Sequence, residues 1–136
     1  MGDRITVNEI STTPLKRIPV IGGDVLHAMK KTDHGFSGFG ESYFSQIESG
    51  VVKAWKKHSK MTLNLIVPIG KVRFVFVDND GLFRVETIGD NNYLRLTIPP
   101  GIWFGFKGIF KNGKPNGYGN LITNNLIYKG YFKNGV

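Results

Sequence analysis

At 136 residues, the chain has the length of one domain and is too short to hold two independent hydrophobic cores. Hydrophobic residues make up 40% of the chain and charged residues 21%, which excludes a disordered or collagen-like protein. The absence of cysteine excludes a disulfide framework and a thiolate zinc site, and the formal charge of +8 indicates an anionic partner.

Membrane insertion and secretion find no support in the pattern of apolar residues. No apolar run approaches the ~20 residues that a spanning helix needs, and the first thirty residues hold no apolar signal region. We therefore expect a cytoplasmic protein without a membrane partner. The lysines are spread along the chain rather than gathered in one segment, which disfavours nucleic acid as the anionic partner.

The predicted elements are mainly short β-strands. Helical periodicity is confined to residues 23–31, for which we expect a short helical turn. Residues 61–68 alternate apolar and polar side chains, and residues 71–77 are rich in β-branched and aromatic side chains. An Asp/Asn/Gly turn predicts a hairpin between strands 71–77 and 82–87, and residues 94–98 form a further strand that ends at two prolines. Strands at this spacing predict a sandwich or barrel.

The C-terminal stretch contains an internal repeat. Residues 106–113 return 22 positions later as residues 128–135, each copy with an aromatic-x-Gly-x-aromatic core and an Asn-Gly pair. This pattern resembles the MORN repeat, a β-hairpin unit of about that length. We expect residues 109–136 to form a C-terminal β-hairpin extension that completes or caps the sheet. A MORN-type binding function and a dimer-forming arm remain as alternatives.

Chemical motifs are scarce, and the few histidines restrict the mechanism. The chain holds only His27, His34 and His58, and no His-x-His pair is present. A cage of neighbouring imidazoles cannot be built from these positions, so we predict no metal and no other cofactor. A P-loop, a dinucleotide-binding glycine turn and a Gly-x-Ser-x-Gly elbow are all missing, which disfavours an ATPase, a dinucleotide oxidoreductase and a serine hydrolase.

Four ordered blocks between roughly residues 30 and 108 carry a resemblance to a known family. They are Asp-His-Gly-Phe with Phe-Gly-Glu-Ser-Tyr-Phe at 33–44, Gly-Val-Val-Lys-Ala-Trp-Lys-Lys-His at 50–58, Val-Pro-Ile-Gly-Lys-Val-Arg-Phe-Val-Phe-Val-Asp at 67–78, and Leu-Thr-Ile-Pro-Pro-Gly-Ile-Trp-Phe-Gly-Phe at 96–106. Together they resemble the dTDP-4-dehydrorhamnose 3,5-epimerases and the related sugar 3,4-ketoisomerases. The resemblance implies an all-β fold, a single cupin-type double-stranded β-helix (jelly roll) over residues 1–108, and a homodimer.

The same resemblance directs attention to the segment around His58. Lys56 takes the position of the epimerase's catalytic histidine, and His58 resembles the second histidine of the ketoisomerases' His-x-His pair. Alternate residues of a strand share one face, so Lys56, His58 and Lys60 could all point into the barrel. Removing a proton next to a ketone needs a base that titrates near neutrality and a cation for the enolate oxygen. We predict His58 as the base and Lys56 or Lys60 as the cation; the alternative is a solvated basic strand end.

Candidate substrate-binding residues follow from the matched blocks and from cations that suit phosphate oxygens. They are Asp33, His34, Phe36, Glu41, Tyr43, Arg73, Asp78, Arg95, Trp103 and Lys107. Tyr43 and Tyr93 are candidate proton donors. The epimerase's acidic tyrosine lies in a C-terminal stretch that the repeat replaces here. The epimerase's active-site lysine has no clear equivalent on the following strand.

The sequence predicts a cofactor-independent epimerase or isomerase of a nucleotide-diphospho-keto-sugar, acting by histidine-mediated proton transfer in surface polysaccharide biosynthesis. The alternative is a non-catalytic cupin that binds a nucleotide sugar or another anion, which Lys56 in the histidine position would favour. A nucleic-acid-binding β-protein is a third hypothesis, and its mark would be steep salt dependence. The identity of the sugar and the nucleotide does not follow from these residues.

Overall fold

Residues 5–109 and 124–133 are described by a computed structural model, and within them the chain forms almost only β-strands. The elements are the 3-10 helix η1 (Val7–Glu9) and the strands β1 (Ser11–Pro14), β2 (Arg17–Ile18), β3 (Val25–Leu26), β4 (Glu41–Glu48), β5 (Val52–Lys57), β6 (Met61–Ile69), β7 (Lys71–Val77), β8 (Phe83–Gly89), β9 (Leu94–Ile98), β10 (Trp103–Gly108) and β11 (Asn124–Lys133). In this described part, no helix is long and apolar enough to cross a membrane.

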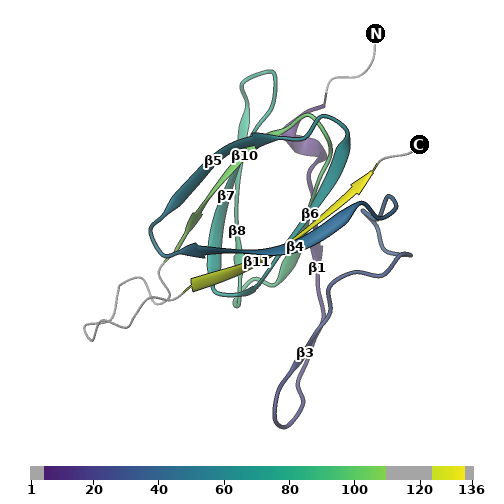
Figure 1. Cartoon of the computed structure of the whole chain (residues 1–136), viewed down its shortest axis with the longest axis vertical. Helices are drawn as coiled ribbons and strands as arrows, with labels where there is room; N and C mark the ends of the chain where they lie inside the picture. The colour runs from purple at the N-terminus through teal and green to yellow at the C-terminus, as the bar shows by residue number, and fades with distance from the viewer. Residues whose placement is uncertain (1–4, 110–123, 134–136) are drawn as a thin grey trace.

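Two antiparallel sheets face each other and form a jelly roll (Figure 1). The five-stranded sheet has the order β1-β9-β6-β11-β4, and the four-stranded sheet has the order β5-β10-β7-β8. A third, two-stranded sheet of β2 and β3 projects away from them (Figure 1). The predicted all-β cupin fold is therefore confirmed, and β4 and β5 each form an edge of their sheet.

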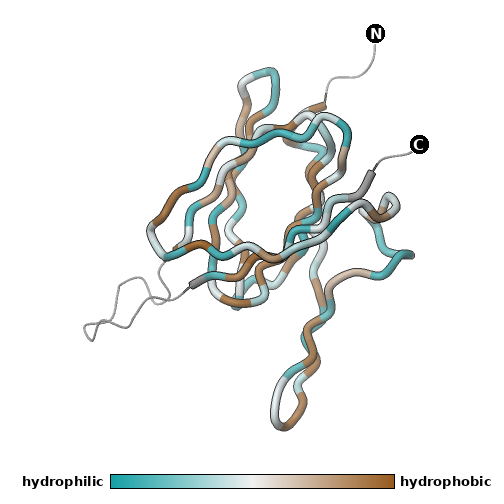
Figure 2. The backbone as a smooth tube through the Cα atoms, in the orientation of Figure 1, coloured by the Kyte–Doolittle hydropathy of each residue, from teal (hydrophilic) through white to brown (hydrophobic). Residues whose placement is uncertain are grey.

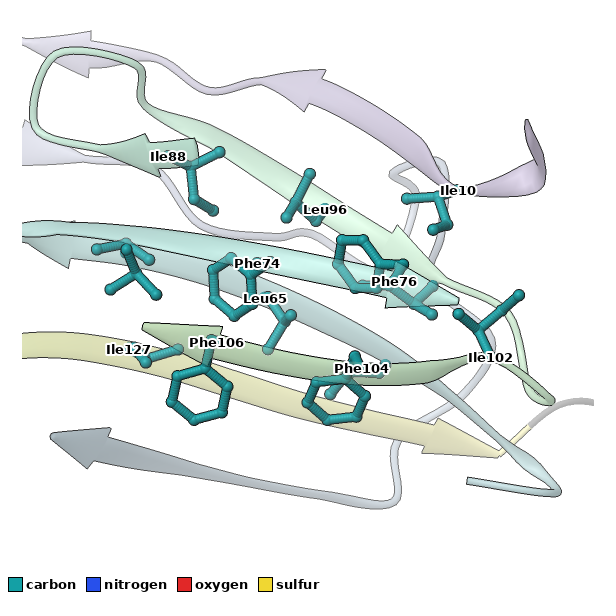
Figure 3. Close-up of a cluster of buried hydrophobic side chains, with 14 of the residues drawn as sticks. Ile10, Leu65, Phe74, Phe76, Ile88, Leu96, Ile102, Phe104, Phe106 and Ile127 are labelled. Atoms are coloured by element: carbon teal, nitrogen blue, oxygen red, sulfur yellow. The ribbon is translucent and has the colours of Figure 1, made fainter. Parts of the chain in front are cut away.

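The core lies between the two sheets and follows from strict alternation along the strands. On β7, Val72, Phe74 and Phe76 are buried, whereas Lys71 and Arg73 are exposed. Figure 2 shows the same alternation of apolar and polar positions along the backbone. The labelled apolar side chains of β6, β7, β9, β10 and β11 gather in one cluster (Figure 3). Each large apolar side chain buried in this way stabilises the fold by about 1.5–3 kcal/mol.

The predicted hairpin of residues 71–77 and 82–87 is confirmed by the pairing of β7 with β8, in which Val75 lies opposite Val85. Asp78 organises the turn between them. Its carboxylate accepts hydrogen bonds from the backbone N–H groups of Asp80 and Leu82, and from that of Val7 at the start of the described chain. Asp78 is buried and fixes this end of the barrel.

The helical turn expected at residues 23–31 is wrong. Val25 and Leu26 form β3, which pairs with β2. Gly22, with a φ of 94°, occupies the reversal between the two strands, a left-handed conformation that glycine adopts without steric cost. A nine-residue segment is also too short to offset the cost of nucleating a helix without packing support.

The two repeat copies lie in different sheets where the structure describes them. The end of the first copy that belongs to β10 pairs with β5 and β7, and the second copy belongs to β11, which lies between β4 and β6. These two described parts therefore do not pair with each other as a hairpin. Residues 110–123 lie outside the described residues, so the domain boundary near 108 and a MORN-type function stay predictions.

Candidate active site

A pocket of about 420 Å³ opens beside β5, the edge strand of the four-stranded sheet, and is also lined by residues of β10 and β11; we call it the edge pocket. Its lining residues are Lys53, Ala54, Trp55, Lys56, Phe104, Phe106 and Lys129. Three lysines and three aromatic side chains thus enclose a space large enough for part of an anionic ligand.

A break in the register of β5 turns two lysines toward this pocket. Lys56 lies opposite the buried Phe104, and Lys53 lies opposite the buried Phe106, although regular alternation would place residues 53 and 56 on opposite faces. The register shifts between Phe104 and Gly105, so β5 holds one extra residue, Trp55, which is 53% exposed. A bulge of this kind re-aims the side chains that follow it.

The opposite wall comes from β11. Lys129 lies between Leu65 on β6 and Tyr43 on β4, and Tyr131 lies between Leu63 and Glu41. Leu63 and Leu65 belong to the buried core, so the side chains paired with them face the barrel interior. Lys129 is only 6% exposed and Tyr131 only 1% exposed.

His58 directly follows β5 and turns its ring into the barrel. The ring stacks on Phe104, with 6.1 Å between centroids, and meets the ring of Tyr131 edge-on at 4.6 Å. Its Nε2 atom is buried and has no hydrogen-bond partner among the described residues. Burial lowers the pKa of His58, the positive charges of Lys56 and Lys129 lower it further, and Glu41 opposes them. The imidazole is therefore neutral near neutral pH and can accept a proton.

Tyr131 forms a hydrogen bond of 2.7 Å between its hydroxyl and that of Tyr43. Burial raises the pKa of Tyr131, and the hydrogen bond with Tyr43 and the charge of Glu41 raise it further. The phenol therefore stays protonated and can act as a proton donor. Tyr43 is 38% exposed, so the pair connects the barrel interior to solvent.

Lys129 is a nearly buried amine without a carboxylate partner among the described residues. Its Nζ atom lies 4.7 Å from the ring centroid of Phe106 and 5.9 Å from that of Tyr43. Burial lowers the pKa of Lys129 to about 8, with further contributions from the charges of Lys56 and Lys53. A buried ammonium surrounded by other cations loses hydration without gaining an ion pair.

The structure brings together His58, Lys56, Glu41 and Tyr43 among the residues that the sequence singled out. Lys60 differs from the expectation. β5 ends at Lys57, so residues 56, 58 and 60 do not share one strand face, and Lys60 is exposed in the bend before β6.

Arg73, Trp103 and Lys107 lie on the outer face of the four-stranded sheet. Lys107 pairs with Arg73, and Trp103 pairs with Val77. They alternate along β7 and β10 with phenylalanines that point into the core, so their side chains point away from it. Lys57 covers Trp103, with its Nζ atom 5.0 Å from the ring centroid. These three residues do not join His58 in the barrel.

Arg95 holds the segment that contains Asp33, His34 and Phe36 against the outer face of the other sheet. Its guanidinium is 1% exposed and donates hydrogen bonds to the carbonyl oxygens of Ala28 (2.6 Å) and His34 (3.0 Å). The Asp33 carboxylate lies 3.6 Å from the same guanidinium. Neighbouring Leu96 points into the core, which places Arg95 on the opposite face. Asp33, His34 and Arg95 lie outside the edge pocket but line a second pocket of about 350 Å³, so their substrate-binding role stays a prediction. Asp78 also lies outside the edge pocket and holds the turn between β7 and β8.

Sequence reasoning missed Lys129 and Tyr131, and it assigned no role to Lys53. Both missed residues belong to the second repeat copy, which we interpreted as a cap. The available signal was their spacing of two residues, because a lysine and a tyrosine at i and i+2 of a strand share one face. Among the described residues, no group of three or more metal-ligating side chains comes together.

Comparisons with known proteins find related chains, although no family model matches. The crystal structure of a dTDP sugar isomerase from Desulfovibrio desulfuricans is 33% identical, with a TM-score of 0.81, and the match covers 96% of this chain and 80% of that one. A probable low-salt glycan biosynthesis epimerase of Haloferax volcanii is 30% identical over 95 residues, which span 65% of this chain and 60% of the relative. A dTDP-4-dehydrorhamnose 3,5-epimerase from Sulfolobus tokodaii shares the fold, with 18% identity, a TM-score of 0.75, and coverage of 98% and 76%.

Proposed function

Since this chain belongs to the family of cupin-type dTDP-sugar epimerases and isomerases, we propose that it moves a proton next to the carbonyl group of a nucleotide-diphospho-keto-sugar. The observation that supports this most directly is the neutral His58, whose unpartnered Nε2 atom lies in the barrel beside a protonated phenol and two lysines. Base, acid and cation are the three groups that such a proton transfer requires.

His58 acts as the base in this proposal. A carbon-bound proton next to a ketone leaves as the electrons of the C–H bond move toward the carbonyl oxygen. The lowered pKa of His58 keeps the imidazole unprotonated at neutral pH, and its Nε2 atom is not engaged by another group of the described chain. The neighbouring Phe104 and Tyr131 rings hold the imidazole in place.

Cations next to the base stabilise the charge that develops on the substrate oxygen. Lys56 and Lys129 both act electrostatically on His58, so each lies near the reacting group, and both line the edge pocket. Lys53 adds a third positive charge to the same pocket, which suits the diphosphate of a nucleotide sugar.

The Tyr131 and Tyr43 pair returns a proton. Tyr131 faces His58 on one side and exchanges a hydrogen bond with Tyr43 on the other. A proton delivered from Tyr131 to the substrate carbon or oxygen is replaced through Tyr43, which reaches solvent. This pair takes the role of proton donor, for which the sequence offered Tyr43 and Tyr93 as candidates.

A non-catalytic cupin that binds a nucleotide sugar is the second candidate. The feature that supports it is Lys56, which by the sequence resemblance takes the position of the epimerases' catalytic histidine. We also propose a cytoplasmic location, a homodimer and a role in surface polysaccharide biosynthesis. The polysaccharide role is supported by the Haloferax relative, which is named a glycan biosynthesis epimerase.

Proton NMR in deuterium oxide separates the two candidates. The wild type, His58→Ala and the matched control His27→Ala are incubated with a panel of nucleotide sugars that includes dTDP-4-keto-6-deoxyglucose. His27 is exposed and lies outside the edge pocket. Loss of a carbon-bound proton signal, or a new isomer, in the wild type and His27→Ala alone would establish the enzyme with His58 as base. Saturable binding without exchange in all three proteins would leave the binding module.

A further inference from the structure

Lys129 stands out among the described lysines as an amine inside the edge pocket. Its side chain is nearly buried, it lines the pocket directly, and it extends from the same strand face as Tyr131. No carboxylate of the described chain forms an ion pair with it, whereas Lys53 and Lys56 repel its charge. Surface lysines lack this combination of desolvation and like charge.

These surroundings favour the uncharged, nucleophilic form of the amine. With a pKa of about 8, roughly a quarter of the Lys129 amines are uncharged at pH 7.5, against about 0.1% for an ordinary lysine. Lysines that attack carbonyl groups are activated in this way, by an apolar pocket or by a second cation nearby. Burial supplies the desolvation, and Lys53 and Lys56 supply the cations. The ring of Phe106, 4.7 Å from the Nζ atom, acts in the opposite direction because an aromatic face favours the ammonium.

We propose that Lys129 forms a protonated imine with the carbonyl carbon of a keto-sugar or another carbonyl compound that carries phosphate. This inference rests on the proposed function and deepens it: it assigns a covalent step to the same pocket, and it replaces the purely electrostatic role of Lys129 while Lys56 stays a cation. The sugar's own ketone is the electrophile, and the lysines around it match the negative charge of the phosphate.

The step balances without a further reactant. The Nζ lone pair forms a bond to the carbonyl carbon, and the π electrons of the C=O bond move to the oxygen, which takes up a proton. The nitrogen then releases a proton and the oxygen takes up another. The nitrogen lone pair forms the second C–N bond as the C–O bond breaks and the oxygen leaves as water. One ammonium group and one carbonyl group thus become one protonated imine and one water.

The imine would strengthen the chemistry assigned to His58. Its positive charge withdraws electrons from the neighbouring C–H bond, His58 takes the proton, and a neutral enamine remains. Return of a proton to the carbon and attack of water on the imine then release the isomerised ketone and restore the Lys129 amine. No anionic enolate has to form.

Reductive trapping tests this proposal. The wild type is incubated with dTDP-4-keto-6-deoxyglucose and sodium cyanoborohydride, which reduces protonated imines. Mass spectrometry then gives the mass of the intact protein and, after digestion, the peptide that carries the adduct. We expect one adduct per chain on Lys129, the same adduct in the exposed-lysine control Lys71→Met, and none in Lys129→Arg. Lys129→Arg keeps the positive charge and should lower solvent deuterium exchange of the sugar at least 100-fold.

A second probe makes the test independent of the sugar. Pyridoxal 5′-phosphate supplies an aldehyde and a phosphate, and at one equivalent we expect its reduced adduct on Lys129 alone. Adducts spread over exposed lysines, or full deuterium exchange by Lys129→Arg, would overturn the imine and leave the proposed function intact. Selective labelling of Lys129 without exchange on any nucleotide sugar would support the imine and contradict the proposed function.

Discussion

The imidazole ring of His58 meets the phenol ring of Tyr131 edge-on, with 4.6 Å between the two centroids. His58 follows β5 at the edge of one sheet, and Tyr131 belongs to β11 inside the other, so the contact joins the two sheets across the barrel. The strand that carries the second repeat copy therefore forms one wall of the candidate active site. Tyr131 also links His58 to Tyr43 through its hydroxyl.

The pKa of His58 should respond in opposite directions to two neighbouring charges. Lys56→Met removes a positive charge that disfavours the imidazolium, so the pKa should rise toward 6.5. Glu41→Gln removes the negative charge that favours the imidazolium, so the pKa should fall below its wild-type value. NMR titration of the imidazole carbon-bound protons measures both shifts.

The same titration predicts the pH dependence of activity. Deuterium exchange that needs neutral His58 should decline as the pH falls through the lowered pKa, below 6.5, and this decline should move to higher pH in Lys56→Met. Lys71→Met, a substitution of an exposed lysine, is the control. It should change neither the pKa of His58 nor the pH at which deuterium exchange declines. Equal pKa values in all variants would show that the charges around His58 are screened.

Tyr131→Phe should separate proton removal from proton return. The phenylalanine ring keeps the packing against His58 but removes the hydroxyl that is hydrogen-bonded to Tyr43. Deuterium exchange from the substrate should persist, whereas formation of the isomerised sugar should fall by about 10²–10⁴-fold, the usual contribution of a general acid. In Tyr43→Phe, formation of the isomerised sugar should fall less, because Tyr131 keeps its own hydroxyl. Equal loss of exchange and of product in Tyr131→Phe would instead assign Tyr131 to substrate binding.

The fold could be predicted from the sequence because its main signals are local. The alternation of Val72, Phe74 and Phe76 with polar neighbours fixes both the strand and the face that enters the core. The site could be predicted only in part, because its geometry depends on two non-local features. One is the bulge at Trp55, which turns Lys53 toward the pocket; the other is the insertion of β11 between β4 and β6.

Matching blocks to a family assigns roles by position in the chain, and it does not tell which of the matched polar residues face His58. Arg73 and Lys107 lie opposite each other on the outer face of their sheet, whereas the ring of His58 lies in the barrel. Arg95 resembled a phosphate ligand, but its hydrogen bonds go to backbone carbonyls of residues 28 and 34. A charged side chain on a strand can face either way, and only the register decides which.

The bulge at Trp55 depends on the absence of a side chain at Gly105. A Cβ atom at this position would lie 2.7 Å from the Cβ of Ala54, closer than two carbon atoms can pack. Gly105→Ala should therefore destabilise the protein by about 1–3 kcal/mol, which denaturant unfolding measures. It should also turn Lys53 and Lys56 away from the pocket and so raise the pKa of Lys129.

The double variant Gly105→Ala with Ala54→Gly provides the matched control. It exchanges the two side chains and removes the clash. The double variant should therefore lose less free energy of unfolding than the losses of the two single variants added together. Additive losses in this cycle would show that the backbone at the bulge relaxes without contact between these two residues.

Lys129→Met should stabilise the protein, and the gain should depend on pH. The pKa of Lys129 is lowered from 10.5 in the unfolded chain to about 8 in the fold, so between these values the unfolded chain binds more protons. The stability of the wild type therefore rises with pH across that window, whereas Lys129→Met lacks this contribution. At pH 7 the variant should be more stable by about 2 kcal/mol, because methionine fills the site without a buried charge.

Thermal unfolding of both proteins at pH 7 and pH 10 measures this difference. The advantage of Lys129→Met should shrink at the higher pH, where the wild-type amine is largely uncharged, and Lys71→Met should show no such trend. An advantage that stays the same at both pH values would mean that the wild-type ammonium is well solvated in the pocket. A destabilising lysine that lines the pocket beside His58 is better explained by a chemical role than by folding, because methionine at the same position would satisfy the fold at lower cost.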